Sequence, residues 1–139
     1  MHTLSKNLLI INILLFSSFF LLPSTEKIFA DTKKISNLEK KAQLVISSQI
    51  NAFQNFDTNR AYSFASPFIQ SKFTNADKFG SMVKSAYPMI WEPKEFKFLE
   101  FTLFNGSLIQ RVLFIDKNER IFTFDYEIKN YGQDRWLIN

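Results

Sequence analysis

The feature that most constrains this chain of 139 residues is a change in the spacing of its apolar residues near Pro93. Before Pro93 the apolar residues recur every three or four positions, which is the spacing of one face of a helix. After Pro93 they alternate with polar residues, most clearly over residues 121–129, as in a strand with one buried face. The sequence therefore predicts an α+β domain in which the helices cover one face of an antiparallel sheet.

Three helices are predicted in the first half of the chain. A long amphipathic helix covers residues 35–56, and the side chain of Asp57 or Thr58 is suited to accept the free amide hydrogens at the start of the second helix. Pro67 ends that second helix. The third helix begins near Asn75 and stops before the next proline, because the residue before a proline disfavours helical geometry.

The predicted sheet is a meander with tight turns. Asn105-Gly106 is a strong two-residue hairpin signal. The expected strands cover residues 96–104, 107–116, 121–129 and 136–138. The alternation slips inside the first strand, which predicts a β-bulge near Leu99 or Glu100. A bulge bends a sheet, so we expect a curved, cone-shaped meander that encloses a pocket under its helices.

The N-terminus has the order of a secretory signal. Lys6 precedes an apolar run from Leu8 to Leu22, and Ala30 suits the position before a cleavage site. The run has 15 residues, whereas a membrane-spanning helix needs roughly 20. We expect residues 1–30 to be a signal peptide of a periplasmic or secreted protein, and the alternative is an uncleaved N-terminal membrane anchor.

Residues 31–139 would then form a single domain with a mild positive charge. The 17 basic and 13 acidic residues of the whole chain become 15 and 12, a net charge of +3. The lysines at positions 33, 34, 40 and 41 cluster on one early helix, without the dense basic stripe of a nucleic-acid-binding protein. The chain has no cysteine, so the core must hold the fold without disulfides, and 17 phenylalanines supply apolar area.

Several chemistries are excluded by missing residue types. The only histidine is His2, inside the expected signal peptide. The predicted domain therefore lacks Ser-His and Cys-His nucleophiles and the usual ligands of zinc, copper and haem. Its three glycines are isolated, so no Gly-rich phosphate loop is present. We expect no cofactor, no metal and no catalytic residue.

Several short segments resemble one family. They are Gln49, Ala52, Phe53 and Asp57, then "AYSFASP" from residue 61, Phe73, Phe79, Met82, Val83 and Tyr87, "QRV" from residue 110, and finally Trp136 and Ile138. The pattern resembles the domain of unknown function 4864 family of small bacterial proteins. The resemblance implies the cystatin-like cone of the nuclear transport factor 2 superfamily and no particular reaction, because fold membership alone does not define a function.

Five polar or amphipathic side chains are candidates to line the pocket. They are Tyr62, Tyr87, Gln110, Tyr126 and Trp136. Each tyrosine lies on an apolar face, where its ring can be buried while its hydroxyl recognises a ligand. The competing interpretation is that each is a core residue hydrogen-bonded to the main chain.

The sequence therefore favours an exported, non-catalytic domain that binds a small apolar or amphipathic ligand in the cone or acts as an interaction module. One alternative is an enzyme of the ketosteroid isomerase type, in which a tyrosine and Asp57 or Asp116 transfer protons. A second alternative is a structural homodimer formed through the sheet, whose outer face carries Ile109, Leu113 and Ile115.

Overall fold

The computed structural model describes residues 24–139, and the apolar run from Leu8 to Leu22 lies outside the described residues. Five helices precede four strands, in the order predicted. The helices are α1 (Thr25–Gln54), α2 (Thr58–Ser63), α3 (Pro67–Gln70), α4 (Ala76–Ala86) and α5 (Pro88–Trp91); the strands are β1 (Glu95–Phe104), β2 (Ser107–Ile115), β3 (Ile121–Asn130) and β4 (Trp136–Ile138). The α+β fold class is confirmed.

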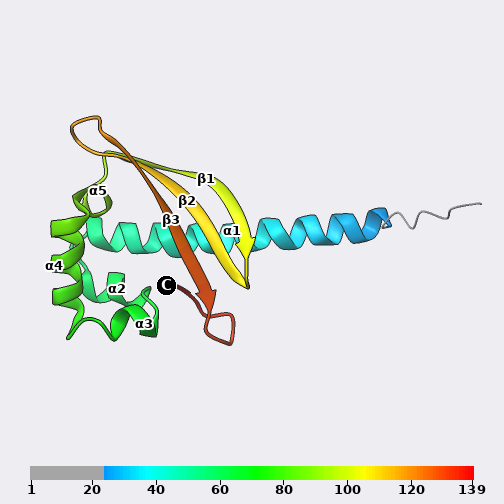
Figure 1. Ribbon diagram of the computed structural model, residues 1–139, viewed down its shortest axis with the longest axis horizontal. Coiled ribbons are helices and arrows are strands. Elements are labelled where there is room, and N and C mark those ends of the chain that lie inside the picture. The colour runs from blue at the N-terminus through cyan, green and yellow to red at the C-terminus, as the bar shows by residue number, and fades with distance from the viewer. Residues whose placement is uncertain (1–23) are drawn as a thin grey trace, which may run out of the picture.

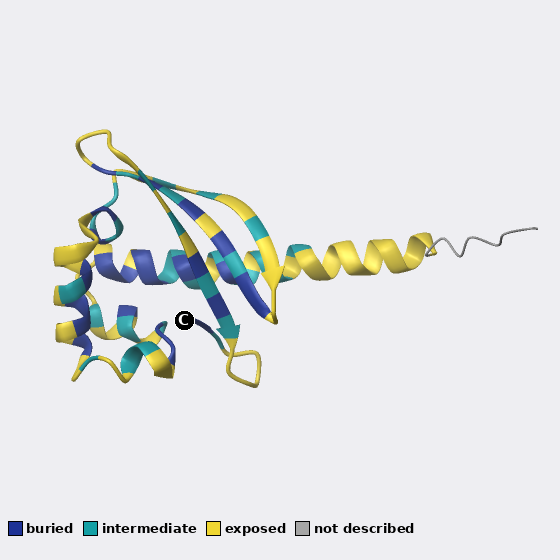
Figure 2. Cartoon of the chain, viewed as in Figure 1, coloured by how far each residue is buried: buried dark blue, intermediate teal, exposed yellow. Residues whose placement is uncertain are grey.

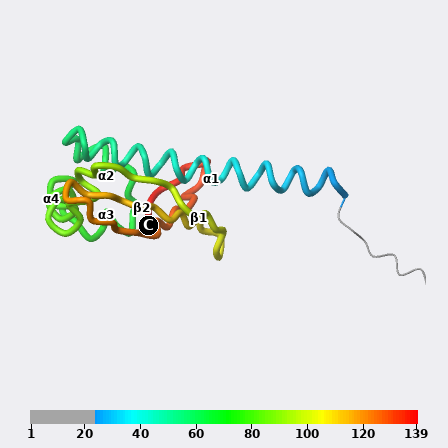
Figure 3. Tube along the Cα trace, turned by 90° about the horizontal axis from the view of Figure 1, so that it is seen from above, coloured from blue at the N-terminus to red at the C-terminus, as the bar shows by residue number. Residues whose placement is uncertain are grey.

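The strands form one antiparallel meander in the order β1-β2-β3-β4, and α1 crosses its inner face (Figure 1). The view from above shows α1 on one side of the molecule and the remaining elements on the other (Figure 3). The main core lies between α1 and the sheet and includes Ile46, Ile50, Val112, Phe114 and Ile128, all fully buried. A second core joins α1 to α2, α4 and α5.

The helical part differs from the prediction in number and in the role of Pro67. Three helices were predicted and five are observed, because prolines begin two short extra ones, α3 and α5. Pro67 starts α3 and does not end α2, since a proline at the first helical position lacks only an amide hydrogen that the helix would leave free. The side chain of Ser66 caps α3 by accepting a hydrogen bond from the amide of Ile69 at 3.2 Å.

The predicted bulge and hairpin turn are both confirmed. The register between β1 and β2 shifts between Phe98 and Phe101, which places the bulge at Leu99 and Glu100. Asn105 and Gly106 have φ angles of 47° and 80°, the left-handed geometry that a two-residue hairpin turn requires. The bulge bends β1, and Figure 1 shows the strands curving over α1.

Helix α1 is much longer than predicted, and its two halves differ in burial. Its C-terminal half packs against the body through Ala42, Ile46, Ile50 and Phe53. Its N-terminal half projects beyond the sheet, and residues 25–35 are exposed (Figure 2). Within residues 24–139, no helix is sufficiently long and apolar to cross a membrane.

Candidate functional site

An apolar cavity of about 290 Å³ lies between the helices and strand β3. Its walls come from α1, α3, α4, α5, β3 and the C-terminal strand. The residues that border it are Gln49, Phe53, Ile69, Phe79, Met82, Val83, Tyr87, Ile90, Phe124, Asp125, Tyr126, Glu127, Ile138 and Asn139. A cavity of this kind is the usual form of a small-ligand site, and its volume is near the lower end of the range of about 300–1,000 Å³.

Aromatic pairs define the walls of this cavity. The ring centroids of Phe53 and Phe79 are 5.9 Å apart, and Tyr87 meets Phe124 edge to face at 5.8 Å. These rings come from α1, the two ends of α4 and β3, so the cavity forms only when the helical layer is packed on the sheet. Aromatic rings in such arrangements hold their geometry through both burial and ring–ring attraction.

The hydroxyl of Tyr126 is buried beside this cavity and has no hydrogen-bond partner among residues 24–139. Burial raises the pKa of Tyr126 well above its ordinary value, so the phenol stays neutral. An unpartnered buried hydroxyl destabilises a fold by about 1–3 kcal/mol. Tyr126 therefore borders the cavity and carries a buried hydroxyl that the described residues leave without a hydrogen bond.

Gln49 adds a second polar group to the wall. The side chain is buried, and its Nε2 donates a hydrogen bond to the carbonyl oxygen of Ala61 at 3.1 Å. That bond fixes the amide orientation, because a carbonyl oxygen needs a donor. The Gln49 side-chain oxygen has no hydrogen bond within the described part of the chain, and it is an acceptor at the cavity.

Two acidic residues of β3 border the cavity, and both carboxylates are bound elsewhere. Arg111 donates to Asp125 at 2.7 and 3.0 Å. Ser107 and Asn139 each donate to Glu127 at 2.7 Å. These hydrogen bonds lower the pKa of both carboxyl groups, so both remain ionised acceptors at neutral pH.

Comparison with known proteins assigns the family. The domain of unknown function DUF4864 matches residues 36–139, three quarters of the chain. The chain belongs to the DUF4864 family. The resemblance in the sequence is thereby confirmed, and the family description names no reaction or ligand.

One solved structure is similar to this DUF4864 protein at low identity. It is a crystal structure from Campylobacter jejuni, described as an NTF2-like transpeptidase, with a TM-score of 0.45 and 15% sequence identity. The similarity covers 66% of this chain and 92% of that chain. A search of curated proteins found no match.

Of the five predicted pocket residues of this DUF4864 domain, the structure places Tyr87 and Tyr126 at the cavity and Tyr62, Gln110 and Trp136 away from it. The Tyr62 hydroxyl donates to the carbonyl oxygen of Gln70 at 2.7 Å. The indole of Trp136 donates to Asp134 at 2.7 Å. Tyr62 and Gln110 thus bond to main-chain carbonyl oxygens, as the competing interpretation had it, whereas Trp136 bonds to the side chain of Asp134.

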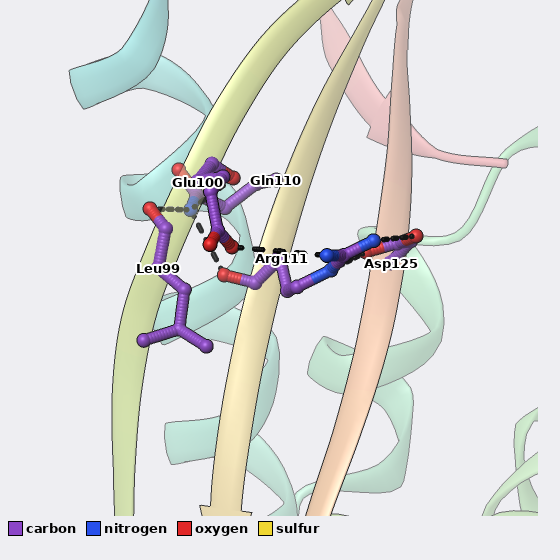
Figure 4. A network of polar contacts seen from close by, with 5 residues as sticks. All are labelled: Leu99, Glu100, Gln110, Arg111 and Asp125. Atoms are coloured by element: carbon purple, nitrogen blue, oxygen red, sulfur yellow. Dashed lines mark hydrogen bonds and ion pairs between the residues drawn. The ribbon is translucent and has the colours of Figure 1, made fainter.

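Gln110 has a structural role of its own in the DUF4864 domain. Its Nε2 lies 3.1 Å from the carbonyl oxygen of Leu99, 3.2 Å from that of Glu100 and 3.0 Å from that of Arg111 (Figure 4). Its side-chain oxygen accepts a hydrogen bond from Gln43 of α1 at 3.4 Å. Gln110 is fully buried, and it supplies the donor that the two bulge carbonyls need. The inward direction predicted for Gln110 is consistent with this position, but its partner is the bulge.

Neither aspartate proposed for proton transfer borders the cavity. The Asp57 side chain caps α2 by accepting from the amide of Arg60 at 2.9 Å. Asp116 is buried at the β2–β3 turn, where it accepts from the amides of Asn118 and Arg120 at 2.8 and 2.9 Å. Burial raises the pKa of Asp116, but the hydrogen bonds from Arg120 and Asn118 outweigh it and the net pKa is lowered.

Within residues 24–139, no group of three or more His, Cys, Asp or Glu side chains is arranged to hold a metal ion.

A second buried polar atom without a partner in this part of the chain is the indole nitrogen of Trp91. Trp91 borders a separate surface cleft with Phe56 and Lys84, whose ammonium lies 5.7 Å from the Trp91 ring.

Much of the cavity wall, including Phe53, Phe79 and Phe124, was not predicted from the sequence. Each lies on a correctly predicted apolar face, but periodicity identifies a buried face and not the place where packing leaves a space. Gln49 did carry a signal, because it interrupts the apolar stripe of α1. A buried amide in such a stripe indicates a specific polar contact.

Proposed function

We propose that this DUF4864 protein is a non-catalytic binding domain whose cavity takes one compact apolar or amphipathic group. The observation that carries the proposal is the Tyr126 hydroxyl, buried beside an apolar cavity without a partner among the described residues. A ligand that accepts a hydrogen bond from this hydroxyl would relieve its desolvation penalty. Ligand sites combine apolar walls with a small number of polar groups in this way.

The chemistry of the wall favours binding over catalysis. Proton transfer by a tyrosine and a carboxylate requires the two groups within hydrogen-bond reach, directly or through one water. The Tyr126 hydroxyl contacts no carboxylate, and Asp125 and Glu127 are each held by other partners. Asp57 and Asp116 cap a helix and a turn. These contacts support a binding role.

The polarity of the wall also limits the ligand. The charged residues that border the cavity are the acidic Asp125 and Glu127, and no lysine or arginine borders it. The wall therefore offers no cationic side chain to pair with an anionic ligand. The Tyr126 phenol offers a donor and the Gln49 side-chain oxygen an acceptor, so a neutral group with an alcohol, amide or similar function fits the wall.

A small probe tests this proposal. Benzyl alcohol, which combines one ring with one hydroxyl, should shift the NMR signals of the cavity residues in a saturable titration. Val83→Phe, which fills the cavity from α4, should weaken this binding by about tenfold or more. Leu113→Phe on the outer face of β2 is the matched control and should bind as the wild type does. Equal binding by both variants, with circular dichroism showing both folded, would overturn the proposal.

Export remains part of the proposal. The order of Lys6, the apolar run and Ala30 supports a signal peptide, and of the described residues cleavage after Ala30 would remove only the exposed residues 24–30. Mass spectrometry of the N-terminus of the protein made by its own cells tests it. An N-terminus at Asp31 is expected, and an intact Met1 would favour the membrane anchor instead.

A further inference from the structure

Strand β3 has a free edge next to the cavity. It pairs with β2 along almost its whole length, but with β4 only over Ile128–Asn130. Residues 121–127 therefore have no strand partner on the side away from β2 among residues 24–139. In Figure 1 this side of β3 faces the region of α2 and α4.

The main-chain groups on that edge can be assigned a direction. The amide of Asn139 donates to the carbonyl oxygen of Glu127 at 2.8 Å, so the Glu127 carbonyl points away from β2. In a strand the N–H and C=O of one residue point to the same side, and alternate residues repeat that direction. The N–H and C=O of Asp125 therefore point toward the free edge as well, and both residues border the cavity.

The site thus combines an apolar cavity with unpaired main-chain N–H and C=O groups that are spaced as along the edge of a strand. No hydrogen bond from another described segment reaches the Asp125 main chain on this side. Free sheet edges of this kind bind extended peptides, in which main-chain hydrogen bonds supply affinity and pockets for alternate side chains supply specificity. A rigid small molecule would use the cavity and leave the edge unpaired.

We propose that an extended peptide segment adds to the free edge of β3 as a short strand and places one apolar side chain in the cavity. This inference rests on the proposed function and names the partner of the same site. The small volume suits a single side chain, and the carboxylates of Asp125 and Glu127 are already paired, so a peptide with an uncharged centre fits best. One peptide carbonyl beside the anchor would lie near the Tyr126 wall.

Synthetic peptides distinguish strand addition at the edge of β3 from binding of a small group in the cavity alone. The full chain would be titrated by NMR with the acetylated and amidated peptide Thr-Val-Leu-Val-Thr, and separately with N-acetyl-leucine amide. The peptide should bind at least about tenfold more tightly, because it adds main-chain hydrogen bonds that the single residue lacks. The amide signals of Asp125 and Glu127 should shift more with the peptide than with benzyl alcohol, because only the peptide adds main-chain hydrogen bonds to the edge of β3.

Backbone substitutions supply the decisive control. Replacing one peptide amide beside the leucine by an ester removes a donor without changing the side chains and should weaken binding by about tenfold. Asp125→Pro removes the corresponding donor from the edge of β3, where a proline is tolerated, and should abolish peptide binding. Thr123→Pro lies on the same edge beyond the cavity and should weaken peptide binding less.

The outcomes distinguish the two proposals. A peptide that binds no more tightly than N-acetyl-leucine amide, or an ester that binds as well as the amide, overturns the strand addition and leaves the cavity proposal standing. Failure of benzyl alcohol, the single residue and the peptide together overturns both.

Discussion

Gln110 and Tyr126 are cross-strand neighbours on the inner face of the sheet, and they differ in whether their polar groups have hydrogen-bond partners. Both are buried, with 0% and 8% of their surface exposed. Gln110 donates to three carbonyl oxygens and accepts from Gln43, whereas the Tyr126 hydroxyl has no partner among residues 24–139. The bulge on the β1 side of the sheet is therefore satisfied by a side chain of the fold, and the β3 side leaves a buried hydroxyl without a partner in a residue that borders the cavity.

The largest expected effect on the free energy of unfolding is at Gln110. Gln110→Leu keeps most of the side-chain volume but leaves the bulge carbonyls of Leu99 and Glu100 without this donor, so we expect a loss of about 2–4 kcal/mol in the free energy of unfolding. Urea denaturation measures it. Gln43→Ala removes two long hydrogen bonds, to Glu39 and to Gln110, at a half-buried position and should cost under about 1 kcal/mol. A Gln110→Leu protein as stable as the Gln43→Ala protein would contradict the claim that Gln110 stabilises the bulge.

Helix α4, which borders the cavity, packs closely against α2 at Gly80. A Cβ at this position would lie 2.5 Å from the Cγ2 of Thr58 in α2, well inside contact distance. Gly80→Ala should destabilise the protein by about 1 kcal/mol or more, because overpacking exceeds the gain in helix propensity. Thr58→Ser removes the clashing methyl group.

Thermal or urea unfolding of the single and double variants tests this contact. The double variant Gly80→Ala with Thr58→Ser should be more stable than Gly80→Ala alone. Equal stability of these two proteins would mean that α2 and α4 separate easily, and the cavity wall would then be adjustable and not fixed.

A smaller effect on stability is expected at the turn between β2 and β3, the strands that carry Gln110 and Tyr126. The pKa of Asp116 is lowered, since its hydrogen bonds outweigh burial, so its contribution to stability is present above the ordinary aspartate pKa of about 3.9. That contribution is lost as the pH falls through the lower pKa of the folded state. Asp116→Asn should have a lower melting temperature at pH 7 and a weaker dependence on pH between about 5 and 2. An unchanged acid dependence would contradict this assignment.

The smallest effect is expected at the N-terminal end of α1, where contact with the body is absent. Residues 25–30 are exposed, so a protein of residues 31–139 should unfold within about 0.5 kcal/mol of one containing residues 24–139. Chemical denaturation of the two proteins side by side provides the test. A larger loss would show that the projecting part of α1 stabilises the domain.

The order of elements, the bulge and the hairpin turn could be predicted because each depends on local residue types. The slipped alternation around Leu99 marked the bulge, and Asn105-Gly106 marked the turn. The position of Pro67 was harder, because a proline can end one helix or begin the next. Ser66 decides between them by capping α3, and that contact depends on where the chain runs after α2.

The site was less predictable than the fold. Alternation assigned Gln110 and Tyr126 to the same face, but it could not show that the bulge carbonyls satisfy one and that the other is left free. Tyr62 and Trp136 carry the same amphipathic signal as Tyr87, and only the three-dimensional positions of Gln70 and Asp134 separate them. The presence of a cavity depends on how the side chains pack, which residue spacing does not determine.

The central claim, that the Tyr126 hydroxyl serves a ligand and not the fold, is tested most directly by urea unfolding of Tyr126→Phe with and without saturating benzyl alcohol. Without the probe, the variant should be as stable as the wild type or up to about 1 kcal/mol more stable, because an unsatisfied hydroxyl is removed. With the probe, the variant should gain less stability than the wild type, since ligand stabilisation follows affinity. A ligand-free loss as large as that of Gln110→Leu, or an undiminished gain from the probe, would contradict the claim.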